Sequence, residues 1–345
     1  MKNKNKIIKI ILFLLIIISL IIIINSKNNI HVGILFSDAG QKDSEIKLLD
    51  KKLNIKKDIK FKAIDSPMVS CINKNIYIPT GFDNKLYHID KNFKISEKKV
   101  SDGGSYIKIK KDFSKLILYN LPINDTNGDV NRVYFSSGNK DSHIDIKKSL
   151  LLCGDFDEKF IYVVGQKFFS ETNIETYLFI IDINSFKLIK EIKFPDRIAV
   201  KTAELVDDKL LISSDSSVDY FLYYDIKGKK LIKDSYNKDF IKDPLEINTI
   251  LHNKNSIFFI SFTGDIIKLN RKTLSFEKKL KLKNKIIVSG DIKENRLYLL
   301  SQKEENNQVA LVDIIDGNNL KQIKENLINP IRNTMPRDIF FFKKK

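Results

Sequence analysis

The sequence contains no tryptophan, only 13 glycines and only two cysteines among its 345 residues. So few glycines leave little material for phosphate-cradling loops. Neither a Walker-type loop, a dinucleotide fingerprint nor a G-x-S-x-G nucleophile motif occurs. The four histidines are scattered and show no spacing typical of a zinc site. These absences argue against the common catalytic centres that short sequence motifs encode.

Acidic residues are also in deficit, which gives a formal net charge of +17, mostly from lysine. A charge of this size favours anionic partners such as acidic lipid headgroups or a polyanionic cell wall. Isoleucine, lysine and asparagine are enriched together, however, so we expect most lysines on solvated strand faces rather than in a dedicated polyanion site. No arginine-rich run and no aromatic-plus-basic cluster occurs, so nucleic acid is not expected as a partner.

The N-terminus combines four lysines, the last at Lys9, with an apolar run from Ile10 to Ile24 that only Ser19 interrupts. Such a segment is typical of a secretory signal or a signal anchor. The run is followed by "NSKNN" rather than by a small-residue cleavage site, so we expect an uncleaved transmembrane helix in residues 1–29. The positive-inside rule then predicts a single-pass membrane protein with its C-terminal bulk outside the cytoplasm. A cleaved signal peptide is the alternative.

After residue 29 no helical periodicity is sustained, and a repeat of about 40 to 46 residues takes its place. Each unit contains an apolar run closed by an Asx residue, as in "LYHIDKNFKISEKKV" and "LFIIDINSFKLIKEIKF". An Asx side chain at this point can bond its own backbone and open a hairpin turn. The aligned residues are Asp50, Asp90, Asp182, Asp225, Asn270 and Asp313. One irregular unit, "NRVYFSSGNKDSHIDIKKS", is expected to have a longer turn.

Two further series of short apolar runs lie upstream of each Asx residue, so each unit comprises four strands. Seven such units predict an all-β fold, a seven-bladed β-propeller of four-stranded antiparallel blades over residues 30–345. The first unit lacks its leading strand, whereas "MPRDIFFFKKK" at the C-terminus is a leading strand without followers. We therefore expect the C-terminal strand to complete the first blade and to close the ring.

The same phrases, "LYHIDKNFKISEKKV" and "LFIIDINSFKLIKEIKF", resemble the seven-bladed propellers of the YVTN and quinoprotein-like groups. The resemblance covers about residues 30 to 345 and implies a propeller that acts as a binding platform. The sequence "YVTN" itself does not occur. The repeated aspartate boxes of sialidase-like propellers are also absent, because those boxes contain tryptophan.

The stretch "NDTNGDVNRVYF" places Asp125, Asn127 and Asp129 at alternate positions, a spacing that can offer oxygen ligands to Ca²⁺. The loop departs from an EF-hand at two positions, where Val130 replaces the glycine and Ser136 replaces the glutamate. A structural turn between two strands is therefore the favoured interpretation, with calcium as the alternative. No other cofactor is predicted.

We expect a binding function: a monomeric, membrane-anchored propeller that binds a protein, a peptide or a cell-envelope polymer. The candidate ligand-binding residues are Asp65, Asp102, Phe168, Phe169, Asp196, Arg197 and Asp243. The alternative is a propeller enzyme of the lyase or lactonase type with a metal in the central channel, which requires carboxylates and histidines to converge at one channel mouth. A scaffold for neighbouring membrane proteins is a third possibility. No catalytic residue is predicted.

Cys71 and Cys153 occupy matching positions in the first strands of the second and fourth units. A whole blade would separate them, whereas a disulfide needs Cα atoms within about 7 Å of each other. The repeat therefore predicts two free thiols with a packing role.

Overall fold

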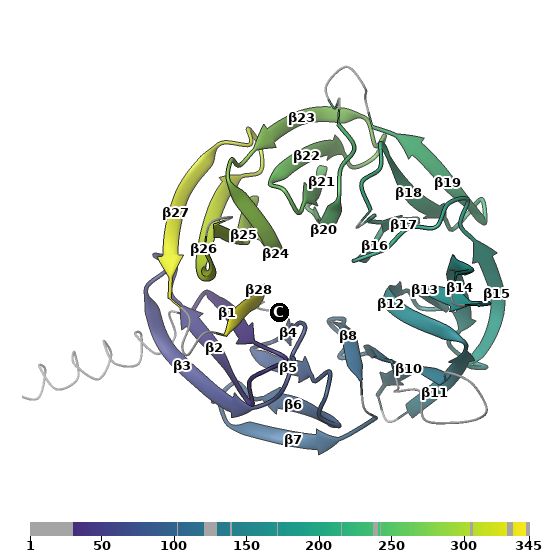
Figure 1. Ribbon diagram of the computed structural model, residues 1–345, viewed down its shortest axis with the longest axis horizontal. Coiled ribbons are helices and arrows are strands. Elements are labelled where there is room, and N and C mark those ends of the chain that lie inside the picture. The colour runs from purple at the N-terminus through teal and green to yellow at the C-terminus, as the bar shows by residue number, and fades with distance from the viewer. Residues whose placement is uncertain are drawn as a thin grey trace, which may run out of the picture.

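A computed structural model of the chain contains seven four-stranded antiparallel sheets arranged around a central axis (Figure 1). The structure describes residues 30–101, 103–120, 130–138, 140–170, 172–214, 216–236, 241, 243–303, 306–329 and 334–342. Over these residues every regular element is a strand. The predicted all-β, seven-bladed propeller is confirmed. The predicted N-terminal helix lies outside the described residues, among which none forms a helix long and apolar enough to cross a membrane.

We label the four strands of each blade A to D from the axis outward. The A strands are β28 (Met335–Phe341), β4 (Ser70–Ile72), β8 (Gly104–Ile109), β12 (Ser149–Phe156), β16 (Ala203–Val206), β20 (Ile247–His252) and β24 (Lys285–Lys293). The B strands are β1 (Val32–Ser37), β5 (Asn75–Pro79), β9 (Lys115–Asn120), β13 (Phe160–Phe168), β17 (Lys209–Ile212), β21 (Ser256–Ser261) and β25 (Arg296–Lys303).

The C strands are β2 (Asp43–Leu49), β6 (Lys85–Ile89), β10 (Val130–Ser137), β14 (Ile174–Asp182), β18 (Tyr220–Asp225), β22 (Asp265–Asn270) and β26 (Asn306–Asp316). The D strands are β3 (Ile55–Lys62), β7 (Ile95–Lys99), β11 (Lys140–Lys147), β15 (Lys187–Lys193), β19 (Lys230–Ser235), β23 (Phe276–Lys281) and β27 (Gln322–Ile328).

The ring closes through the C-terminus, because β28 pairs antiparallel with β1 and becomes the A strand of the first blade. Ile34 lies opposite Ile339, and Val32 lies opposite Phe341. The first blade is thus built from both ends of the propeller, as the incomplete first and last units predicted. This pairing covers the inner edge of β1, which would otherwise be exposed.

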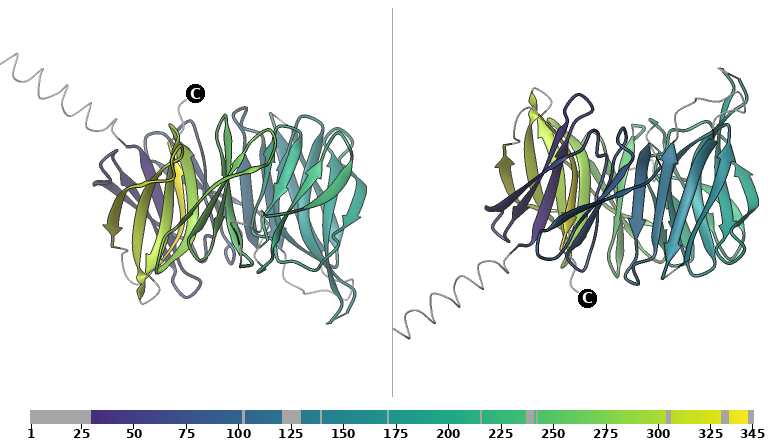
Figure 2. Two further views of the ribbon diagram at one scale, coloured as in Figure 1. Left: turned by 90° about the horizontal axis from the view of Figure 1, so that it is seen from above. Right: turned by 90° about the horizontal axis from the view of Figure 1, so that it is seen from below.

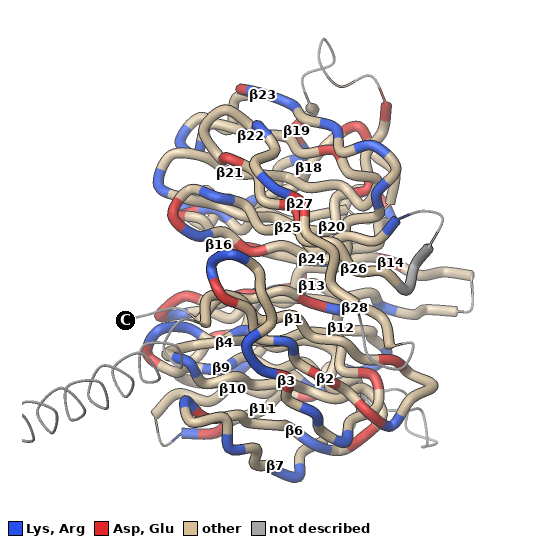
Figure 3. The backbone as a smooth tube through the Cα atoms, turned by 90° about the vertical axis from the view of Figure 1, so that its left-hand side faces the viewer, with Lys and Arg blue, Asp and Glu red and all other residues tan. Residues whose placement is uncertain are grey.

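Burial changes from the inner strands to the outer ones, and this change explains the sequence pattern. All six residues of β21 are buried, because a B strand lies between neighbouring strands and has a blade on each face. All five residues of β7 are exposed, because a D strand has one free edge and faces solvent. The lysines of the sequence accordingly concentrate on the D strands, where they are interspersed with Asp and Glu (Figure 3).

The Asx residues that end the C strands form the predicted turns, and the turns explain the scarcity of glycine. Asp90 accepts hydrogen bonds from the backbone N–H groups of Asn92 and Lys94 at 2.9 and 2.8 Å. Three residues after Asp90, Phe93 has a left-handed φ of 67°. This strained conformation costs a non-glycine residue free energy, and the Asx bonds offset that cost.

Two details of the repeat were predicted wrongly. In the seventh blade the turn residue is Asp316, which accepts hydrogen bonds from Asn318 and Asn319, whereas Asp313 is fully buried within β26. The cause is the length of β26, whose 11 residues carry two aspartates three positions apart. In the third blade the turn between β10 and β11 is not longer but spans two residues, since Ser137 pairs with Lys140.

Neither cysteine forms a disulfide, as predicted. Cys153 is fully buried in β12, and burial raises the pKa of its thiol well above the ordinary value. Cys71 in β4 is half-buried.

These environments predict unequal thiol reactivity. Because the thiolate is the reactive form, iodoacetamide should modify Cys71 in the folded protein at least about tenfold faster than Cys153. Peptide mass spectrometry before and after denaturation measures both rates. Equal rates in the folded state would contradict the packing of β12.

Candidate binding face and central channel

The antiparallel order of strands gives the propeller two faces, between which the strands run (Figure 2). We call A–B face the one formed by the A–B and C–D connections, and B–C face the one formed by the B–C connections and the connections between blades. Residue 30 lies at the A–B face, because His31 donates its backbone N–H to Leu49 just before the C–D turn of the first blade. The segment that precedes Ile30 therefore joins the ring on this side.

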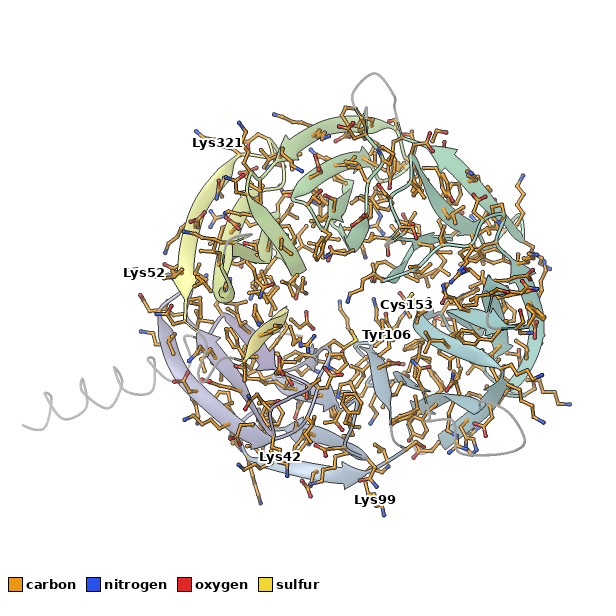
Figure 4. The ribbon with its side chains drawn as sticks, in the orientation of Figure 1. Lys42, Lys52, Lys99, Tyr106, Cys153 and Lys321 are labelled. Carbon is orange, nitrogen blue, oxygen red and sulfur yellow. The ribbon has the colours of Figure 1, made fainter. Side chains whose placement is uncertain are left out.

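The seven A strands surround a channel with a volume of about 2240 Å³. Its wall contains backbone and side chains from every blade, and Tyr106 and Cys153 of one buried apolar cluster lie beside it (Figure 4). Phe262 and Met335 line the channel together with Arg337.

Three A-strand aspartates fasten neighbouring blades to each other with the same geometry. Each carboxylate accepts the N–H of the following residue and a second backbone N–H from within, or directly before, the next A strand of the ring. The acceptor–donor pairs between blades are Asp155 with Leu205 (2.9 Å), Asp291 with Phe341 (3.1 Å) and Asp338 with Val69 (2.8 Å). Because this arrangement recurs and uses both carboxylate oxygens, we infer that these three aspartates stabilise the contacts between neighbouring blades.

Asp338 is a buried carboxyl of the channel wall. Burial raises its pKa to about 6, although hydrogen bonds from the hydroxyl of Ser289 and from Val69 and Ile339 favour the ionised form. The nearby Asp291 raises the pKa further.

A series of contacts between polar and ionised side chains connects four consecutive blades near the A–B mouth of the channel. Lys108 on β8 contacts the carboxylates of Glu204 and Asp155, the latter at 3.5 Å. Lys110 lies 3.2 Å from Asp155, and Glu204 lies 3.5 Å from Nε2 of His252.

The protonation states in this series follow from burial and neighbouring charge. Burial would raise the pKa of Glu204, but Lys108 beside it lowers that pKa to about 2. Burial would likewise lower the pKa of Lys108, and the carboxylates of Asp155 and Glu204 raise it instead. Both side chains are therefore ionised at neutral pH, and the ion pairs are balanced within the protein.

Carboxylates and a histidine do converge here, as the enzymatic alternative requires, but the ammonium group of Lys108 lies between the two carboxylates. Within the described ranges no group of three or more His, Cys, Asp or Glu side chains is arranged to hold a metal ion. The donor set thus does not fit a metal at this mouth. Sequence reasoning missed Lys108, Asp155, Glu204 and His252, although each stands in the first strand of its repeat.

The predicted ligand-binding residues that the structure describes lie on the B–C face and not in the channel wall. Asp65 pairs with Arg337 at 3.1 Å, and Asp196 binds the ammonium of Lys233 and the hydroxyl of Tyr220, both at 2.8 Å. Arg197 and Asp243 are exposed on the same face. Four predicted residues fall outside the described part of the chain, namely Asp102, Asp125, Asn127 and Asp129.

Phe168 and Phe169 differ in their surroundings. Phe168 is half-buried at the end of β13, whereas Phe169 is 56% exposed, with its ring centroid 6.5 Å from that of Tyr177. Two further phenylalanines are exposed in B–C connections of other blades, Phe82 at 67% and Phe262 at 39%. The B–C face thus presents a phenylalanine from each of the second, fourth and sixth blades. The sequence contained a signal for this set that was missed: each phenylalanine occupies a similar position in its repeat, directly after or shortly after the B strand.

Comparison of the sequence with protein-family models and with curated proteins finds no match. The fold is similar to that of solved structures at low sequence identity. Dihydro-heme d1 dehydrogenase NirN, solved in complex with DHE, is 12% identical with a TM-score of 0.60, over 91% of this chain and 75% of that one.

Two other solved structures are similar. BamB from Moraxella catarrhalis is 12% identical with a TM-score of 0.51, over 83% of each chain. The β-propeller domain of Cps50 (Swd1) from Myceliophteria thermophila is 9% identical with a TM-score of 0.55, over 79% of this chain and 94% of that one. Identities this low support a shared fold and no shared activity. The chain has the seven-bladed β-propeller fold that its resemblance to the YVTN and quinoprotein-like propellers predicted.

Proposed function

We propose that this protein is a membrane-anchored, extracytoplasmic binding platform whose B–C face binds a protein or peptide. The observation that carries the proposal is the set of three exposed phenylalanines, Phe82, Phe169 and Phe262, on one face. Aromatic side chains are the residues that most often supply binding energy in protein interfaces. Mixed charges accompany them, as the polar rim of such interfaces requires.

The position of residue 30 supports the choice of face. The N-terminal segment joins the ring at the A–B face, so an anchor in residues 1–29 leaves the B–C face directed away from the membrane. The channel offers less support for a function, because the carboxylates of Asp155 and Glu204 near its A–B mouth are already paired with Lys108 and Lys110.

A matched pair of triple variants of the full chain tests the proposal. The first replaces Phe82, Phe169 and Phe262 with serine. The control replaces Ile55, Ile95 and Phe113 with serine, which are 46%, 37% and 40% exposed and lie in or next to connections of the A–B face. Both variants remove three exposed apolar side chains, so both should fold.

We expect quantitative affinity capture from envelope extract to recover a polypeptide with the wild type and the control, and at least about tenfold less of it with the phenylalanine variant. This loss corresponds to truncation of one or two interface anchors. If every captured polypeptide is retained equally by the two variants, the B–C face is not the binding surface.

A further inference from the structure

The charged residues of the connections are distributed unequally between the two faces. In the described A–B and C–D connections, fourteen Lys and Arg stand against eight Asp and Glu, an excess of six positive charges. In the described connections of the B–C face, five Lys and Arg stand against seven Asp and Glu, an excess of two negative charges. The net charge of +17 conceals this polarity.

The acidic groups of the A–B face are largely engaged within the protein. Asp50 and Asp90 hold the backbone of their own turns, and Asp157 accepts hydrogen bonds from Lys159, Phe160 and Tyr162. Asp207 pairs with Arg271 at 2.6 Å. These carboxylates are held in place within the protein. Their negative charges remain, and the face keeps its excess of six positive charges.

The basic groups of the same face are mostly not engaged. Of the fourteen, only Lys110, Lys227 and Arg271 form an ion pair within the described part of the chain. The other eleven are lysines, and most of them are exposed at turn tips, such as Lys52, Lys254 and Lys272. Lys52 and Lys321 lie at the rim of neighbouring blades (Figure 4). Free lysines thus extend around the ring.

We propose that the A–B face lies against an anionic membrane surface. Two independent observations support this partner: the excess of unpaired lysines, and the entry of the chain at Ile30 on this face, directly after the apolar run from Ile10 to Ile24. Each lysine held near an anionic bilayer contributes a roughly fivefold gain in binding. The inference rests on the proposed anchor, which brings this face within reach of the headgroups.

The test uses the full chain reconstituted into vesicles of phosphatidylcholine alone or with about one third phosphatidylglycerol. An amine-reactive label, read by peptide mass spectrometry, measures the exposure of each lysine. On the anionic vesicles, labelling of Lys52, Lys254 and Lys272 should fall at least about threefold relative to phosphatidylcholine. Labelling of Lys42, Lys148 and Lys283 on the B–C face should not change. High salt should abolish the difference, because exposed charges are screened.

Charge-reversal variants supply the matched control. Replacing Lys52, Lys254 and Lys272 with glutamate should remove the protection of the remaining A–B lysines, such as Lys321. The same replacement of Lys42, Lys148 and Lys283 should leave it intact, although the net charge changes equally. Equal labelling on both vesicle types overturns the proposal, as does protection by soluble polyphosphate without protection by the anionic vesicles.

Membrane insertion of the proposed anchor is measured separately in the same preparation. Flotation with phosphatidylcholine vesicles reports insertion of the N-terminal segment, and the effect of phosphatidylglycerol on labelling reports the A–B face. A protein that floats but shows no lipid-dependent protection retains its anchor and lacks the basic docking face. A protein that does not float contradicts the anchor itself, and with it the proposal.

Discussion

Deletion of Arg337 to Lys345 is expected to abolish the cooperative thermal unfolding of the propeller. The deletion removes most of β28 and the following Phe342. The side chains of Ile339, Phe340, Phe341 and Phe342 are all at most 5% exposed. Burial of each such side chain contributes about 1.5–3 kcal/mol, so the four together approach the 5–15 kcal/mol that stabilises an ordinary folded protein. The deletion also removes Asp338, which fastens the first blade to the second.

Calorimetry or circular dichroism of the truncated and full-length proteins measures the effect. Removal of residues 343–345 alone, beyond β28, is the control and should shift the melting temperature little. A truncated protein that melts within a degree or two of the full-length one would show that the ring does not depend on its C-terminal strand.

A single substitution in β28 tests the same contribution to stability with a smaller expected effect. Phe341 is 1% exposed and packs edge-on against Tyr298 with ring centroids 4.7 Å apart. Replacing Phe341 with alanine should cost about 3–5 kcal/mol, since it leaves a large cavity where the first and seventh blades meet.

Replacing Lys285 with methionine is expected to destabilise the protein by about 3–5 kcal/mol, because it leaves a buried carboxylate without its cation. The ammonium of Lys285 contacts Asp313, whose side chain is fully buried, and lies 2.6 Å from Glu325. Asp313 also accepts hydrogen bonds from Ser301 and Gln322, which do not supply a compensating charge.

Chemical denaturation of three variants separates charge from packing. Lys62 to methionine is the control, because the Lys62–Asp43 pair is 79% and 44% exposed and should contribute less than about 1 kcal/mol. The double variant with Lys285 to methionine and Asp313 to asparagine should regain most of the loss. If Lys285 and Lys62 variants unfold at the same denaturant concentration, the pair in the seventh blade is not a buried one.

Much of the fold was predictable because each blade repeats a local burial pattern. The B and C strands are apolar on both faces, and the Asx turns that follow the C strands recur where the chain must reverse. These local features gave the number of blades, the unbridged cysteines and the role of the C-terminal strand. They failed where local signals were ambiguous. Strand β26 contains both Asp313 and Asp316, and only burial shows that Asp313 is the residue of the buried ion pair and Asp316 the residue of the turn.

The sequence by itself determined that this chain forms seven four-stranded blades, because strand periodicity and turn chemistry are properties of neighbouring residues. Only the tertiary structure decided which side chains meet. Lys108, Asp155, Glu204 and His252 come from four different blades and approach one another because the ring places A strands side by side. The same ring assigns every connection to one of two faces. It thereby places the turn lysines Lys52, Lys254 and Lys272 on one face and Phe82, Phe169 and Phe262 on the other.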